Sequence, residues 1–214
     1  MIVTGNLYAF LWNDLRRNNC NAYLIDGSKR ILIDPGFGEF MARLKTEPGG
    51  LSLPLESIDA ALITHGHPDH FDGVNGLPKT TVFAIAEDDY QMVRNAMGPS
   101  ALAPEPAFFL VEGDLAIGDT ELRIISTPGH SPASVSIYWP ARKALFTGDV
   151  IFCQSIGRTD LFGGNGKLLK ESIKRLAALD VEYLLPGHGE IIRGAEAVRQ
   201  NFSFIESSWF DYLR

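Results

Sequence analysis

The sequence contains few of the residues and segments that would place it in several common classes of protein. Two cysteines occur in 214 residues, Cys20 and Cys153, and they lie far apart and outside any Cys-x-x-Cys pattern. Such cysteines are typical of reduced thiols in a reducing compartment. The apolar runs are only a few residues long, as at 107–111, whereas a helix that spans a bilayer needs about 20 apolar residues. We therefore expect no membrane-spanning segment.

Basic residues are also few, and they form no long run. The chain has 19 Lys and Arg against 26 Asp and Glu, which gives a formal net charge of −7. Proteins that bind nucleic acids normally carry a positive surface, because phosphate contacts supply much of their affinity. Arg16 and Arg17 follow the first apolar patch, which is the wrong order for a signal peptide. We expect a cytoplasmic protein with a small-molecule substrate and neither a nucleic-acid nor a membrane partner.

The pattern of apolar residues indicates an α/β protein. Short strand patterns alternate with helical patterns, and hairpin-type turns such as 26–29 join some of the strands. This combination predicts mixed sheets rather than a purely parallel one. We expect a single domain over residues 1–214 that ends in a helix over 195–213. The apolar face of that helix either packs on the domain's own sheet or forms a homodimer or lid surface.

Side chains that can bind metals are concentrated in one stretch, His65-Gly66-His67-Pro68-Asp69-His70, which follows the apolar run 60–64. Imidazole and carboxylate groups are the side chains that bind divalent metals such as zinc. A strand that ends in this turn would hold the four groups rigidly at the edge of a sheet. The stretch therefore predicts part of a metal site.

The remaining histidines and one further aspartate follow predicted strands in the same way. His130 ends Thr-Pro-Gly-His, His188 ends Leu-Pro-Gly-His, and Asp149 follows the strand pattern 144–147. No histidine lies outside this pattern, since the chain contains five in all. Seven such ligands are too many for one tetrahedral zinc. They suit two metal ions that share a carboxylate and a water, an arrangement that indicates hydrolysis.

With these residues in this order, the chain resembles the metallo-β-lactamase superfamily. That resemblance implies an α/β fold, a four-layer αββα sandwich of two mixed sheets flanked by helices. Within the superfamily the chain is similar to a single-domain, glyoxalase II-like (hydroxyacylglutathione hydrolase-like) metallohydrolase. The segments that carry this similarity are 127–131, 154–161 and 185–189.

The resemblance also implies a role for each candidate residue. The expected metal ligands are His65, His67 and His130 for the first ion, Asp69, His70 and His188 for the second, and Asp149 as a bridge between them. Asp69 is also the candidate catalytic residue, through proton transfer. Asp34 would orient a ligand imidazole, or else cap a turn. Arg158 would hold an anionic substrate group, or else pair with a nearby carboxylate.

The implied reaction is hydrolysis of a thioester or ester by a binuclear centre, with two divalent ions that we expect to be zinc, or alternatively iron or manganese. Residues 189–214, which follow the last histidine, suffice for one helix, whereas glyoxalase II has a C-terminal helical domain that helps to hold glutathione. The resemblance therefore does not fix a glutathione thioester as the substrate. The alternative is a mononuclear iron oxidoreductase resembling persulfide dioxygenases, with His65, His130 and Asp149 as ligands.

Overall fold

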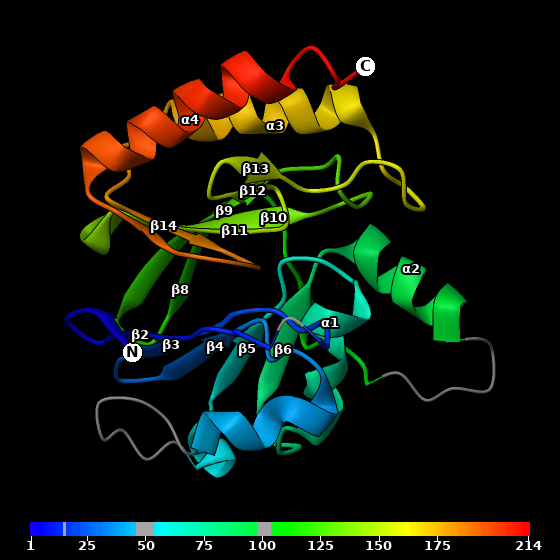
Figure 1. Ribbon diagram of the computed structural model, residues 1–214. Helices are drawn as coiled ribbons and strands as arrows, with labels where there is room; N and C mark the ends of the chain where they lie inside the picture. Colours follow the sequence, from blue (N-terminus) through cyan, green and yellow to red (C-terminus); the bar gives the residue numbers. More distant parts are fainter. Residues whose placement is uncertain (15, 46–53, 98–103) are drawn as a thin grey trace. The chain divides into compact units, whose positions relative to one another are not determined.

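The computed structural model describes residues 1–14, 16–45, 54–97 and 104–214 (Figure 1). Backbone contacts divide the chain into two compact units. The first, which we call the N-terminal unit, comprises residues 1–110 and 116–120, and the second, the C-terminal unit, comprises 111–115 and 121–214. The single domain expected over residues 1–214 stays a prediction.

The N-terminal unit is built on a seven-stranded mixed sheet. Its strands lie in the order β1 (Ile2–Thr4), β2 (Leu7–Phe10), β3 (Ala22–Asp26), β4 (Arg30–Ile33), β5 (Ala60–Leu62), β6 (Val82–Ile85) and β7 (Phe108–Phe109). The first four strands pair antiparallel, whereas β4, β5, β6 and β7 are parallel neighbours. The carboxyl ends of β4 and β5 therefore lie at the same edge of the sheet.

Helical segments cover this sheet, because their apolar side chains pack on its buried residues. The segments are the 3-10 helices η1 (Gly38–Lys45), η2 (Leu55–Ser57) and η3 (Asp72–Gly76) and the α-helices α1 (Pro68–Phe71) and α2 (Glu87–Met97). Met41 and Leu44 of η1 join Leu24 and Leu32 of the sheet in one apolar cluster. A second cluster brings helices α1 and α2 onto β5 and β6. The second cluster anchors both ends of the turn that carries the four predicted ligands.

The C-terminal unit is built on a six-stranded mixed sheet. Its strands lie in the order β15 (Ile192–Arg193), β14 (Tyr183–Pro186), β11 (Ala144–Gly148), β10 (Val135–Trp139), β9 (Thr120–Ser126) and β8 (Gly113–Ile117), although the end of β8 and the first residue of β9 are counted with the N-terminal unit. Strands β11 and β14 pair parallel, whereas β14 with β15, β11 with β10 and β10 with β9 pair antiparallel. A short hairpin of β12 (Ile151–Phe152) and β13 (Ser155–Ile156) follows β11. The 3-10 turn η4 (Pro140–Arg142) connects β10 to β11.

Two helices, α3 (Gly166–Ala177) and α4 (Ala195–Trp209), lie side by side on this second sheet (Figure 1). Leu169 and Ile173 of α3 and Phe202 and Ile205 of α4 belong to one core cluster with the strands. The apolar face of the last helix thus packs on the sheet of its own unit. The helix ends at Trp209, before the predicted limit of 213, because Leu213 turns back into the same core. Its use as a homodimer surface stays a prediction.

The expected α/β class is confirmed, with two mixed sheets flanked by helices. Among the described residues, no helix is both long and apolar enough to cross a membrane.

Candidate metal centre

In the N-terminal unit, four predicted ligands lie on the turn that follows β5 and on the short helix α1 that continues it. The buried strand β5 leads to His65, and Pro68 begins the helix, where its missing N–H costs no hydrogen bond. The N–H groups of His70 and Phe71 both donate to the carbonyl of His67 at 3.0 Å. This hydrogen bonding fixes Asp69 and His70 within the first helical turn. His65, His70 and Asp69 are all buried.

The carboxylate of Asp34 connects this turn to the neighbouring strand β4. Its Oδ1 accepts from the Thr64 N–H at 2.8 Å, and its Oδ2 accepts from the Thr64 hydroxyl at 2.7 Å. Oδ2 also lies 2.9 Å from Nδ1 of His70. Asp34 is buried and has a φ of +52°, a backbone conformation that is uncommon for a non-glycine residue. Asp34 therefore orients a predicted ligand, as one of its two expected roles requires.

This network determines which ring nitrogen of two histidines can bind a metal. A carboxylate accepts hydrogen bonds, so Nδ1 of His70 carries the proton and Nε2 keeps its lone pair. The Thr64 hydroxyl donates its proton to Asp34, so it accepts from Nδ1 of His65, which lies 3.1 Å away. Nε2 of His65 likewise keeps its lone pair. Hydrogen bonds of this kind orient metal-binding histidines and raise their basicity.

Helix α2 holds the backbone between His65 and His67. The carboxylate of Asp89, a fully buried residue, accepts from the N–H of Gly66 at 2.9 Å. A Cβ atom on Gly66 would lie 2.7 Å from the Asp89 carbonyl oxygen and 2.9 Å from Val93. Only glycine fits between the two histidines, and Asp89 fixes their backbone. The sequence did not predict this contact, because acidic residues at a helix start are expected from the helix dipole alone.

In the C-terminal unit, His130 lies on a turn between β9 and β10 that packs against α3. Gly129 has a φ of +134°, and a Cβ there would lie 2.2 Å from the backbone nitrogen of Leu169. The Ser172 hydroxyl donates to the Pro128 carbonyl at 2.8 Å. The Arg158 carbonyl lies 2.8 Å from Nδ1 of His130. Because a carbonyl can only accept, Nδ1 is protonated and Nε2 is the nitrogen that can bind a metal.

Asp149 and His188 follow the parallel strands β11 and β14, whose carboxyl ends meet at one edge of the second sheet. The N–H of Gly187 donates to the Gly148 carbonyl at 2.8 Å and ties the two turns together. Oδ2 of Asp149 lies 3.6 Å from Nε2 of His130 and 3.4 Å from Nε2 of His188. One carboxylate oxygen thus faces two imidazole nitrogens. This is the arrangement needed for a carboxylate shared between two ions.

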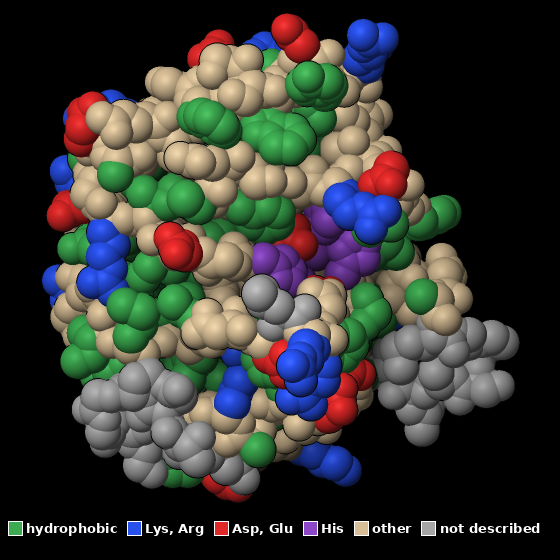
Figure 2. Space-filling view, in the orientation of Figure 1, with side chains coloured by type: hydrophobic (Ala, Val, Ile, Leu, Met, Phe, Trp, Pro, Cys, Tyr) green, Lys and Arg blue, Asp and Glu red, His purple; other side chains and the backbone are tan. Residues whose placement is uncertain are grey.

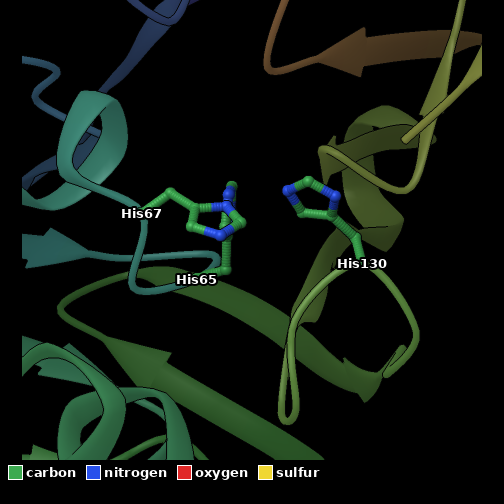
Figure 3. A group of neighbouring side chains, drawn as sticks. All are labelled: His65, His67 and His130. Carbon is green, nitrogen blue, oxygen red and sulfur yellow. The ribbon is translucent and has the colours of Figure 1, made fainter. Parts of the chain in front are cut away.

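The described His and Asp side chains include three groups that could hold a metal ion. They are His65 with His67 and His130, His65 with His70 and Asp149, and Asp69 with His70 and His188. All seven predicted ligands occur in these groups. Figure 3 shows the first group, with His65 and His67 on the turn after β5 and His130 on the turn after β9. Histidine side chains also reach the molecular surface (Figure 2).

The Arg158 side chain forms an ion pair within its own loop. Its Nε and Nη2 donate to the two carboxylate oxygens of Asp160 at 2.9 and 2.8 Å. This pairing lowers the pKa of Asp160 from 3.8 to about 2. Pairing with a nearby carboxylate was one of the two expected roles of Arg158, and contact with a substrate stays a prediction. The Arg158 group that contacts a predicted ligand is its backbone carbonyl, which lies next to His130.

Comparison with known proteins gives the class to which this fold and these residues belong. Residues 15–188 match the model of the metallo-beta-lactamase superfamily, so the chain belongs to that superfamily. The chain is 35% identical over 185 residues to a probable metallo-hydrolase, YqgX, of Bacillus subtilis, covering 79% of this chain and 84% of the relative. It is 31% identical over 215 residues to a hydroxyacylglutathione hydrolase of Francisella tularensis subsp. novicida, covering 96% of this chain and 75% of the relative.

A solved structure is also similar to this chain. The structure of TTHA1623 in a di-iron-bound form is 32% identical to this chain, with a TM-score of 0.70, and the match covers 90% of this chain and 96% of that one. The chain is therefore a metallohydrolase of the metallo-beta-lactamase superfamily, with a cluster of His and Asp residues suited to divalent metal ions.

Proposed function

We propose that this protein is a binuclear metal-dependent hydrolase of a thioester or ester, similar in activity to glyoxalase II. The observation that carries the proposal is Oδ2 of Asp149, which faces the Nε2 atoms of both His130 and His188. A single-metal site does not need a carboxylate oxygen in this shared position. The similarity to a hydroxyacylglutathione hydrolase supports thioester chemistry.

The donor set fits divalent ions. Two imidazoles, His70 and His130, each direct Nδ1 to an acceptor oxygen, so that Nε2 is left to bind a metal. We propose that His65, His67 and His130 hold one ion and that Asp69, His70 and His188 hold the other, with Asp149 between them. When bound, two such ions lower the pKa of a shared water and polarise the substrate carbonyl. Zinc is the proposed metal, and the di-iron form of TTHA1623 makes iron the next candidate.

The chain's own groups orient the reaction and move its proton. Asp34 and the Arg158 carbonyl fix the tautomers of the ligand imidazoles. We propose that the carboxylate of Asp69 accepts the proton of the attacking water and passes it to the leaving thiolate or alkoxide. The bond between the acyl carbon and its sulfur or oxygen breaks, and water supplies the hydroxyl of the acid product. The proposed partner is a small-molecule substrate.

The test is the metal content and activity of the Asp149→Ala variant, with Asp180→Ala as control. Asp180 is a surface carboxylate of the same unit that pairs with Lys143 at 2.6 Å. Protein purified without added metal is expected to hold two zinc ions and to hydrolyse thioesters. D149A should lose metal from both positions, whereas D180A should match the wild type.

Two results would contradict the proposal. Full metal content and activity in D149A would show that Asp149 does not bridge the two ions. One iron per wild-type chain, with oxygen uptake on a persulfide, would instead support the dioxygenase-like alternative.

A further inference from the structure

The predicted ligand Asp69 is held by a short segment of the connection between β2 and β3. The Asn18 side-chain amide donates through Nδ2 to Oδ2 of Asp69 at 2.8 Å. Two residues later, the N–H of Cys20 donates to the backbone carbonyl of Asp69 at 3.3 Å. The segment 18–20 thus contacts both the carboxylate and the backbone of this ligand, across 51 residues of sequence.

The two residues that follow Asn18 are themselves held by hydrogen bonds. The buried Asn19 accepts through Oδ1 from the N–H of Phe37 at 2.8 Å. Nη2 of Arg43 donates to the Cys20 carbonyl at 2.8 Å. The Arg43 guanidinium also lies 5.2 Å from the ring centroid of Trp12, at the start of the same connection. Although Asn18 is exposed, its backbone therefore lies in a defined place, and its amide is aimed at Asp69.

The contact involves the oxygen that faces the neighbouring ligand. Oδ2 of Asp69 lies 4.0 Å from Nε2 of His70, and both residues belong to the third candidate group. A carboxylate oxygen has two lone pairs, so it can accept one hydrogen bond and still bind a cation. A neutral amide donor fixes the rotation of the carboxylate and adds no positive charge that would repel a metal ion.

From these contacts we propose that Asn18 is a positioning residue that sets the occupancy of the second metal position, the one formed by Asp69, His70 and His188. This inference rests on the binuclear centre proposed above. Without the Asn18 amide, the Asp69 carboxylate rotates more freely, and the second ion must order it on binding. The first position, which does not include Asp69, keeps its affinity.

The test compares stepwise zinc binding by the metal-free wild type, N18A and N18L. N18L keeps the branched shape of the side chain and removes the donor, so that the two variants separate hydrogen bonding from space filling. N75A is the matched control, because the exposed Asn75 amide also donates within this unit, to the Asp72 carbonyl at 3.1 Å. Zinc is titrated against a competing chelator, and the bound zinc is measured at each step.

In both N18A and N18L, the second zinc is expected to bind about 10–100-fold more weakly, which is the usual effect of losing a group that orients a ligand. The first zinc and the melting temperature of the metal-free chain should stay unchanged, which a merely structural role of Asn18 would not produce. N75A should bind both ions as the wild type does.

Two outcomes would overturn the proposal, and they differ in whether the binuclear centre also fails. If the wild type binds two zinc ions and the Asn18 variants bind the second equally well, Asn18 does not position Asp69, and the binuclear centre stands. If the wild type binds one ion at saturation, the binuclear centre and the role of Asn18 both fail.

Discussion

Substitution of Asp34 by Asn tests whether a buried carboxylate controls the tautomer of a metal ligand. Asn tolerates a φ of +52° nearly as well as Asp, so the change adds little backbone strain. The amide oxygen can still accept from the Thr64 N–H, but the amide nitrogen replaces the oxygen that faced the Thr64 hydroxyl and Nδ1 of His70. An NH2 group donates, so His70 must turn its Nδ1 lone pair toward it and carry the proton on Nε2.

These changes set the expected losses of metal affinity and of folding stability. A metal ion at the proposed site would have to displace a proton from Nε2 of His70, and loss of such an orienting group typically weakens metal binding about 10–100-fold, or about 1.4–2.8 kcal/mol. Two of the three hydrogen bonds to Asp34 also lose their acceptor, and the third keeps an uncharged one, which predicts about 1–3 kcal/mol of lost stability after rearrangement. That loss is smaller than the typical stability of about 5–15 kcal/mol, so D34N should still fold.

Three measurements on the metal-free D34N chain check this reasoning: zinc affinity, thermal unfolding, and the imidazole tautomer of His70 from nitrogen chemical shifts. The matched control is D59N, because the Asp59 carboxylate also accepts two hydrogen bonds, from Nζ of Lys29 at 2.8 Å and from the Arg30 N–H at 2.9 Å. D59N should bind zinc as the wild type does. Wild-type zinc affinity in D34N, with the proton still on Nδ1 of His70, would refute the proposed role of Asp34.

Two further predictions concern the turn that carries His130 and the loop behind it. G129A should destabilise the chain by about 3 kcal/mol or more in urea unfolding, because the backbone of α3 must move. G113A, at a similar φ of +142° with no atom within 4 Å of the added Cβ, should cost only about 1 kcal/mol, and equal losses would contradict the packing argument. In R158A, a carbon-detected NMR titration should find the pKa of Asp160 raised from about 2 toward 3.8, because the ion pair with Arg158 is the largest cause of the shift. Because the ion pair depresses this pKa, its contribution to stability is present above pH 4 or so and is lost as the pH falls toward about 2, and an unchanged Asp160 titration would show that Arg158 is not the cause.

The candidate metal ligands could be found from the sequence because each follows an apolar strand that is ended by a local signal, and their binding of a metal stays a prediction. Pro68 begins α1 immediately after His67, and Gly129 lets the chain turn before His130. Strand ends of this kind are encoded by neighbouring residues, so they can be found without knowledge of the fold. The same holds for the mixed α/β class, which follows from apolar periodicity and hairpin turns.

The groups that orient the ligands could not be predicted in this way. Asn18 contacts Asp69 across 51 residues, and Asp89 contacts Gly66 across 23 residues. Neither residue lies in a local pattern that distinguishes it from an ordinary polar residue of a loop or a helix start. Their roles depend on which backbone the fold brings next to them. Thr64 is an intermediate case, because its position directly before His65 was visible but its hydrogen bond to Asp34 was not.

The parallel pairing of β11 with β14 affects the order in which parts of the protein fold. Asp149 and His188 are brought together by this pair, and the chain between them includes the β12–β13 hairpin and all of α3. Contacts that close such long connections form slowly, because the loss of chain entropy comes before the gain from pairing. In the centre proposed above, a metal ion shared by Asp149 and His188 would bind only after this pairing, to a chain that has already acquired most of its secondary structure.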